Sequence, residues 1–417
     1  MKPMEYLAKL QAMLPRRKSD ATEPIAADVS ETPYYREKSV VYATAQMVIL
    51  MILAVFLAVS FLTGSGRLSV ENWTLFISDL SSAVVLPEAG STETLTYVAD
   101  EQNRFASYRG GLAVLGKERL TVFTATGREN YTVSLGYNTP RLISSGKYLL
   151  AYDLGGSELS VYNSFTKLFD TVTDSPIRGI AVSEAGYFGV ITDDSAYAGC
   201  VTLYDGDFDV ISRFHLKEHT VCAAIADDGE QIAIASVASQ EGRLQLTLLL
   251  AVPGESEAQG SVTLQDAYPL SMSYTEQGLM LLCSDRVYAI DRDGSLLGEY
   301  YFQTESVTGA SLGAAGCVLL SRANNYNSDT RVLALDAKGE IAYDLIVSGS
   351  VVDAVMDESG ALYLLYADAL TMHIDGESAP RDTVALMSSY EELLPMGEGE
   401  IFVCGQARAV YVRLQAE

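Results

Sequence analysis

One acidic segment of the chain resembles the start of a calcium-binding loop. Residues 205–209 read Asp-Gly-Asp-Phe-Asp. An EF-hand loop needs glycine at its sixth position and glutamate at its twelfth. This chain has Val210 and Leu216 at those positions, so the EF-hand pattern fails. Asp and Gly are also favoured in tight turns, and we therefore predict a turn here.

Two of the three histidines lie four residues apart, at His215 and His219, in the segment His-Leu-Lys-Glu-His. The zinc-protease motif needs glutamate directly after the first histidine, whereas here Glu218 precedes the second. If both histidines lie on one strand, they are about 13 Å apart, too far to share a metal ion. The third, His373, is distant in sequence. We therefore expect no metal site and no cofactor.

The cysteines show neither a zinc-binding spacing nor a C-x-x-C pair. Their number is odd, they are widely spaced, and each lies in an apolar segment. They are Cys200, Cys222, Cys283, Cys317 and Cys404. We predict that they are free thiols of the core, with one disulfide as the alternative. The chain also lacks a G-x-S-x-G elbow, a phosphate-binding loop and a dinucleotide fingerprint, so we expect no enzyme.

From about residue 100, a unit of four apolar strands recurs every 36–49 residues. Each unit has a glycine turn after its first strand. These glycines are Gly110, Gly146, Gly186, Gly229, Gly278, Gly316, Gly360 and Gly399. Glycine suits a hairpin that needs a positive φ. The period predicts an all-β fold, a β-propeller of eight four-stranded blades, with seven blades as an alternative. Immunoglobulin-like units would be about 100 residues long.

The last unit, Tyr390–Leu414, has room for only three strands. A propeller ring that does not close leaves exposed strand edges, which promote aggregation. We therefore predict that an earlier segment, near Ser82–Leu86, supplies the missing strand beside Val410–Leu414.

A long apolar segment, Val40–Leu62, precedes the repeats and contains no charged residue. About 20 apolar residues cross a bilayer as a helix. The segment is too long, and lies too far from the start, for a cleaved signal peptide. A core helix of a soluble domain would show polar residues on one face, and this segment has no such face. We predict a single transmembrane helix.

The anchor divides the chain into four parts. We predict a mostly disordered cytoplasmic tail over 1–39, the transmembrane helix over 40–62, a linker over 63–80 and an extracytoplasmic propeller over 81–417. Seven Lys and Arg residues precede the apolar segment and only Arg67 follows it closely. Basic flanks stay in the cytoplasm, so the C-terminal domain lies outside the plasma membrane.

The acidic composition limits the partners. The 417 residues include 54 acids and 28 bases, for a formal net charge of −26. Such a surface repels nucleic acid, so we expect no nucleic-acid partner.

The repeated third strand, as in Leu159–Tyr162 and Val201–Tyr204, carries a resemblance to known proteins. The chain resembles WD40-like and quinoprotein-like propellers. More closely, it looks like an uncharacterised family of bacterial single-pass membrane proteins with an extracytoplasmic propeller. That resemblance implies an envelope location and a binding or scaffold role. The Gly-His and Trp-Asp dipeptides of WD40 repeats are absent, and the only tryptophan, Trp73, precedes the repeats. A quinone cofactor is therefore not expected.

Propeller ligands commonly bind the face formed by the loops that join the second to the third strand and the fourth strand to the next blade. On this face we predict a ligand site at Asp193, Asp194, Tyr197, Tyr268, Asn325 and Tyr326. The predicted function is a membrane-anchored binding or scaffold module for a protein or envelope ligand. One alternative is a transmembrane sensor that relays outer binding to the tail, and another is an extracytoplasmic hydrolase or lyase.

Overall fold

The computed structural model describes residues 94–414, apart from residues 125–126, 256–257, 303, 324–327 and 398, together with residues 44, 46–48 and 51. The chain separates into two compact units, residues 1–74 and residues 75–417. The predicted span over 40–62 lies outside the described residues except at those five positions, as do the predicted linker and Ser82–Leu86. Among the residues that are described, no helix is both long enough and apolar enough to cross a bilayer.

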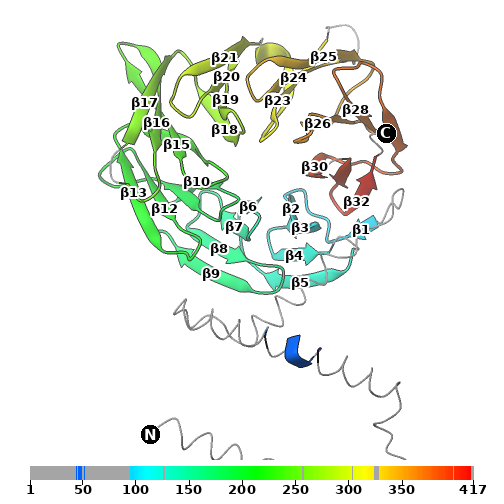
Figure 1. The fold of residues 1–417 in the computed structure, drawn as a ribbon, viewed down its shortest axis with the longest axis horizontal. Coiled ribbons are helices and arrows are strands. Elements are labelled where there is room, and N and C mark those ends of the chain that lie inside the picture. The colour runs from blue at the N-terminus through cyan, green and yellow to red at the C-terminus, as the bar shows by residue number, and fades with distance from the viewer. Residues whose placement is uncertain are drawn as a thin grey trace, which may run out of the picture. The chain divides into compact units, whose positions relative to one another are not determined.

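The second unit is an eight-bladed β-propeller, and each blade is a four-stranded antiparallel sheet (Figure 1). This confirms the predicted fold class and the count of eight blades. The strands of blades 1 to 4 are, in order, β2 (Arg104–Tyr108), β3 (Gly111–Leu115), β4 (Arg119–Phe123), β5 (Glu129–Ser134), β6 (Pro140–Ser144), β7 (Leu149–Asp153), β8 (Glu158–Tyr162), β9 (Lys167–Val172), β10 (Ile177–Val182), β11 (Phe188–Thr192), β12 (Gly199–Tyr204), β13 (Val210–Leu216), β14 (His219–Ile225), β15 (Ile232–Gln240), β16 (Arg243–Ala251) and β17 (Ala258–Gln265).

Blades 5 to 8 follow the same pattern, with one 3-10 turn, η2 (Thr304–Ser306), between blades 5 and 6. The last blade takes its fourth strand from the start of the domain. The strands are β18 (Pro269–Thr275), β19 (Gly278–Cys283), β20 (Arg286–Ile290), β21 (Leu296–Tyr301), β22 (Val307–Gly313), β23 (Gly316–Arg322), β24 (Thr330–Asp336), β25 (Ile341–Val347), β26 (Asp353–Met356), β27 (Leu362–Leu365), β28 (Ala369–His373), β29 (Asp382–Ala385), β30 (Glu392–Gly397), β31 (Glu400–Cys404), β32 (Arg408–Arg413) and β1 (Thr94–Thr96).

The core lies between the blades. The second strands are buried on both faces because each blade packs against two neighbours; every residue of β3, β7 and β19 is buried. The fourth strands alternate between exposed and partly buried residues, as in β17. Hydrophobic clusters join successive blades, and one of them closes the ring between blade 8 and blade 1. The continuous apolar runs in the middle of each unit therefore mark strands that are covered on both sides.

The glycine turns have two different causes. At Gly316, a Cβ atom would lie 2.1 Å from the carbonyl oxygen of Leu335, so only glycine allows the strands to approach. The φ of Gly186 is +92°, which supports the predicted positive φ. The prediction was wrong at Gly146, which is not among the positive-φ glycines. A Cβ there would instead lie 2.5 Å from a carboxylate oxygen of Glu184.

The acidic segment 205–209 forms the predicted turn. The Asp205 Oδ1 atom accepts hydrogen bonds from the backbone N–H groups of Asp207 and Asp209, both at 2.9 Å. Asp291 and Asp336 make the same pair of hydrogen bonds at the corresponding turns of blades 5 and 6. An aspartate that bonds its own backbone in this way stabilises the turn.

The ring closes through β1, which pairs antiparallel with β32 so that Thr94 lies opposite Val410. The closure by an early strand is thus confirmed, but its predicted position at Ser82–Leu86 was wrong. The alternating Thr-Leu-Thr sequence of β1 explains the choice, because it buries Leu95 to 2% exposure between blades 8 and 1. The side-chain amide of Asn103 then donates to the carbonyl oxygens of Val98 and Gln406.

All five cysteines are free thiols, which confirms that prediction over the alternative of a disulfide. Four are buried and Cys222 is partly exposed.

Candidate functional site

Four of the six predicted ligand residues fall on one face of the propeller, formed by the loops from second to third strand and from fourth strand to the next blade. We call it the loop face and the opposite side the turn face. Asp193, Asp194 and Tyr197 lie in the loop between β11 and β12, and Tyr268 lies between β17 and β18. Asn325 and Tyr326 lie outside the described residues.

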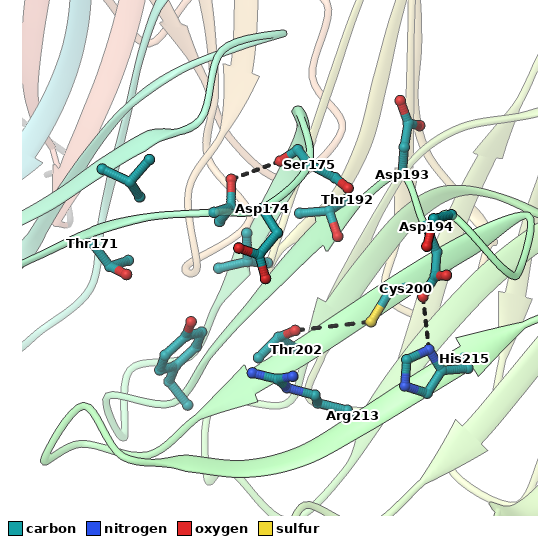
Figure 2. A pocket seen from close by; sticks show the side chains of 15 residues that line it. Thr171, Asp174, Ser175, Thr192, Asp193, Asp194, Cys200, Thr202, Arg213 and His215 are labelled. Atoms are coloured by element: carbon teal, nitrogen blue, oxygen red, sulfur yellow. Dashed lines mark hydrogen bonds and ion pairs between the residues drawn. The ribbon is translucent and has the colours of Figure 1, made fainter.

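A pocket of about 280 Å³ opens beside the first of these loops, between blades 2 and 3 (Figure 2). The end of β9 and the residues after it, including Asp174, form one wall. The other wall consists of β11, β12 and β13, with Asp193 and Asp194 at its rim. Tyr197 and Tyr268 do not line it. The volume lies at the lower limit for organic-ligand pockets, and the lining is largely polar, so the pocket suits a small polar group or an ion.

Strand register brings the most reactive side chains of this pocket together. Cys200 on β12 pairs directly with His215 on β13, and Thr202 pairs with Arg213. Directly opposed residues of an antiparallel pair project from the same face of the sheet. The alternate residues of β12, Val201 and Leu203, contribute to the hydrophobic core on the other side. Cys200 and Thr202 of β12 therefore face the pocket together with Arg213 and His215 of β13.

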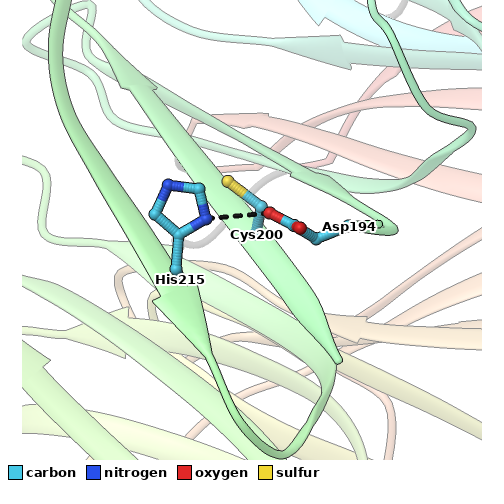
Figure 3. A group of neighbouring side chains, drawn as sticks. All are labelled: Asp194, Cys200 and His215. Carbon is cyan, nitrogen blue, oxygen red and sulfur yellow. Dashed lines mark hydrogen bonds and ion pairs between the residues drawn. The ribbon is translucent and has the colours of Figure 1, made fainter. Parts of the chain in front are cut away.

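Asp194 completes a cluster with Cys200 and His215 (Figure 3). One donor atom from each of the three side chains lies within 4.8 Å of the other two. The Asp194 Oδ2 atom is 2.8 Å from His215 Nδ1, and the Oδ1 atom accepts hydrogen bonds from the backbone N–H groups of Ala196 and Tyr197. The hydrogen bond from the Ala196 backbone N–H, followed by the hydrogen bond to His215 and then that from Tyr197, lowers the pKa of the Asp194 carboxyl.

The thiol in this cluster differs from an activated nucleophile. Cys200 is only 7% exposed, and burial raises its pKa, with a smaller contribution from the negative charge of Asp194. Reactive cysteines have a lowered pKa because the thiolate is the nucleophile. The Cys-His-Asp arrangement resembles a catalytic triad in composition, but the raised pKa of the Cys200 thiol works against the thiolate form.

Asp193, the neighbour of Asp194, has a different partner. The Arg178 guanidinium binds it with two hydrogen bonds, of 3.0 and 2.6 Å, and both side chains are about half exposed. The hydrogen bond from Arg178 lowers the pKa of Asp193. The two adjacent aspartates therefore have separate roles, one in a surface ion pair and one in the cluster.

Sequence reasoning missed Cys200 and the partners of His215. His215 and His219 were considered as two residues of one strand, but they lie on β13 and β14 in different blades. Cys200 was assigned to the core from its apolar neighbours. Pairing β12 with β13 directly from the 205–209 turn would place Cys200 opposite Phe214. A bulge between Leu203 and Tyr204 shifts the register by one residue and brings His215 opposite Cys200 instead.

A second group of acidic residues lies where the inner strands of blades 7 and 8 begin. Burial, followed by the nearby negative charge of Asp353, raises the pKa of Glu392 to about 7, while Arg104 opposes the rise. Asp353 accepts a hydrogen bond from the backbone N–H of Leu393, and burial raises its pKa as well. This pair links blade 7 to blade 8 at the loop face.

A larger pocket, of about 570 Å³, lies on the turn face and is lined by the turns of blades 5 to 8. Much of its lining is Gly, Ala, Pro and Met, with carboxylates such as Glu358. It gathers no cluster of mixed metal-binding side chains among the described residues.

Exposed large apolar side chains gather on the loop face. Fourteen such residues occur in the described part of the propeller, and nine are in loop-face loops or at the ends of strands that reach them. These nine are Val98, Val172, Tyr197, Tyr268, Leu270, Tyr301, Ile346, Val352 and Met387. The other five, Leu168, Val210, Leu296, Leu297 and Ile341, all lie at the turn-face ends of outer strands.

A family model described as a family of unknown function, DUF5711, matches residues 89–359. No curated protein matches the chain. Similar solved structures include Sqt1 from Saccharomyces cerevisiae, with 12% identity, 78% of this chain and 99% of that chain covered, and a TM-score of 0.56. The computationally designed protein Ika8 has 10% identity, with 78% of this chain and 100% of that chain covered, and a TM-score of 0.57. BamB from Moraxella catarrhalis has 11% identity, with 79% of this chain and 100% of that chain covered, and a TM-score of 0.51. At these identities, the likeness shows the propeller fold alone.

Proposed function

Because the chain belongs to the DUF5711 family, whose function is unknown, we propose a function from the molecule itself: a membrane-anchored propeller that binds a protein or envelope ligand through its loop face. The fold is one that commonly serves as a binding or scaffold module. We further propose that the propeller is not an enzyme. The burial of Cys200 supports this, because it raises the pKa of the thiol and so disfavours the thiolate nucleophile.

The observation that carries the proposal is the unequal distribution of exposed apolar side chains. Single exposed apolar residues are common on soluble proteins, but a concentration on one face favours a protein interface. Met387 is fully exposed, and Tyr197 and Tyr268 present aromatic rings, which are enriched at interfaces. A protein partner that covers this face would remove these side chains from water.

Membrane attachment and an outside location remain part of the proposal. The uncharged segment 40–62 supports an anchor, and the basic residues before it support a cytoplasmic N-terminus. Protease added to intact cells is expected to degrade the propeller, and the chain is expected to stay with membranes after alkaline extraction. If the propeller were protected from protease in intact cells, the proposed orientation, with the propeller outside the membrane, would be wrong.

Photo-crosslinking in cells tests the binding face. A photoreactive residue is placed in the full chain at Tyr197 or Met387 on the loop face, or at Leu297 or Ile341 on the turn face as matched controls. All four side chains are exposed and apolar. We expect discrete protein adducts from the loop-face positions only. Adducts from the turn-face positions alone, or equal yields from both faces, would overturn the proposed interface.

Charged variants then test specificity. With the photoreactive residue at Val352, the pair Tyr197→Asp and Met387→Asp is expected to reduce adduct yield at least several-fold. The matched pair Leu297→Asp and Ile341→Asp is expected to leave it unchanged. An unchanged yield with the first pair would show that the apolar face does not contribute to binding.

A further inference from the structure

The three donor atoms of Asp194, Cys200 and His215 differ in element: a carboxylate oxygen, a sulfur and an imidazole nitrogen (Figure 3). This combination is typical of zinc and related transition metals, whereas calcium and magnesium prefer oxygen alone. Tetrahedral zinc ligands lie roughly 3.5 Å apart, given bonds of about 2.0 to 2.3 Å. The donor atoms of the three side chains are separated by up to 4.8 Å. They would have to move by about an ångström to reach tetrahedral spacing, which a side-chain rotation can provide.

The cluster is held in place before any ligand arrives. Two backbone N–H groups fix Asp194 Oδ1, which directs Oδ2 towards His215 Nδ1. Strand pairing fixes Cys200 opposite His215. The Tyr197 ring packs against the imidazole, with 5.0 Å between the ring centroids. Supporting contacts of this kind position metal ligands and commonly change metal affinity about 10- to 100-fold when they are removed.

The Cys200 sulfur has unused binding capacity. Within the part of the chain that the structure describes, its only contact is a long one, of 3.9 Å, with the Thr202 hydroxyl. A metal ion bound by Asp194 Oδ2 and His215 Nδ1 would replace the hydrogen bond that now joins these two atoms. The pocket of about 280 Å³ beside them leaves room for a further ligand. Zinc sites with three protein ligands keep such a position open for water or a partner group.

We propose that Asp194, Cys200 and His215 form a three-ligand site for a zinc-type divalent metal ion, with its fourth position open to the pocket between blades 2 and 3. Binding releases the thiol proton, so that Cys200 coordinates as a thiolate and His215 as a neutral imidazole. A bound metal ion stabilises the thiolate that burial alone disfavours. The site shares Tyr197 with the proposed partner-binding face, but its three ligands are not among the exposed apolar residues that define that face.

Cobalt titration of the metal-free, reduced full chain tests the site. Cobalt(II) can occupy zinc-type sites and, unlike zinc, absorbs visible light, so that its binding can be followed by absorbance. We expect one equivalent to give the visible bands of four-coordinate cobalt and a near-ultraviolet thiolate-to-cobalt band, both removed by added zinc. Cys200→Ser should abolish the thiolate band, and His215→Gln and Asp194→Asn should each weaken binding roughly 10-fold or more.

Two control variants separate this site from other thiols and from general damage. Cys317→Ser, in blade 6, and His219→Gln, in blade 4, are expected to leave the cobalt spectrum and affinity unchanged. Circular dichroism checks that each variant is folded. If Cys200→Ser does not fold, the Asp194→Asn variant is used in its place to test the site. Absence of a thiolate band in the wild-type chain, or its persistence in folded Cys200→Ser, would overturn the proposal.

Discussion

Blades 3 and 7 each place a histidine and an aspartate among strands, yet the two groups are used differently. In blade 7, His373 is 2% exposed; Nδ1 donates to the carbonyl oxygen of Glu377, and Nε2 accepts from the Thr371 hydroxyl. In blade 3, His215 borders an open pocket with one ring nitrogen uncommitted among the described residues. Polar groups that are saturated by the protein itself stabilise the fold, whereas uncommitted atoms beside a cavity can bind a ligand.

The aspartates show the same contrast. The buried Asp357 accepts hydrogen bonds from Ser359, from the backbone N–H of Ala361 and from the Tyr363 hydroxyl, at 2.6 to 3.0 Å. The Tyr363 hydroxyl in turn accepts a bond from the backbone N–H of Gly399, which joins blade 7 to blade 8. Asp194 uses one oxygen to fix its own loop and presents the other to the cluster.

The largest expected effect is the loss of Asp357. Asp357→Ala leaves several buried donors without an acceptor, which should lower the free energy of unfolding by about 3 kcal/mol. Urea denaturation followed by circular dichroism measures the change. The matched variant Asp194→Ala should leave the urea midpoint close to wild type. Equal destabilisation by both changes would contradict the distinction between a structural and a ligand-binding aspartate.

A smaller loss is expected from the tyrosine that links the two blades. Tyr363→Phe removes one hydroxyl that is both donor to Asp357 and acceptor from Gly399, at a cost of about 1 to 2 kcal/mol in unfolding free energy. The same urea experiment applies. Tyr197→Phe, at an exposed tyrosine of blade 3, is the control and should be neutral. A neutral Tyr363→Phe would mean that water replaces the hydroxyl.

The smallest effect concerns pH. Burial lowers the pKa of His373 in the folded protein below its ordinary value of about 6.5. As the pH falls below about 6.5, the unfolded chain therefore gains a proton that the folded chain does not, and stability is lost until the lowered folded pKa is reached. His373→Gln should make this loss shallower between pH 7 and pH 5 by about 1 kcal/mol or less. Urea midpoints at both pH values measure it, and an unchanged slope would show that His373 does not contribute.

Much of the fold could be read from the sequence because it repeats. The glycine turns and apolar strands recur in every unit, and a missing fourth strand in the last unit required an earlier segment to close the ring. The closing strand itself was harder to locate, because β1 has only three residues and its fit depends on the burial of Leu95 between two blades.

The candidate site was only partly predictable. Asp193, Asp194 and Tyr197 stood out because they form a polar loop on the expected face. Nothing in the sequence distinguishes Cys200 from the four other cysteines, all of which follow or interrupt apolar residues. His215 had an obvious neighbour in His219, yet a turn separates the two histidines into different blades.

The sequence by itself determined the strand period, the acidic composition and the apolar segment 40–62, because these depend on residue type and spacing along the chain. It favoured eight blades with seven as an alternative, and the structure decided for eight. Only the tertiary structure decided that Asp194, Cys200 and His215 meet. Their proximity depends on the pairing register of β12 with β13 and on the hydrogen bonds that fold the 193–198 loop back towards them. A one-residue shift in that register would move Cys200 out of the pocket and into the core, because neighbouring strand residues face opposite sides of the sheet.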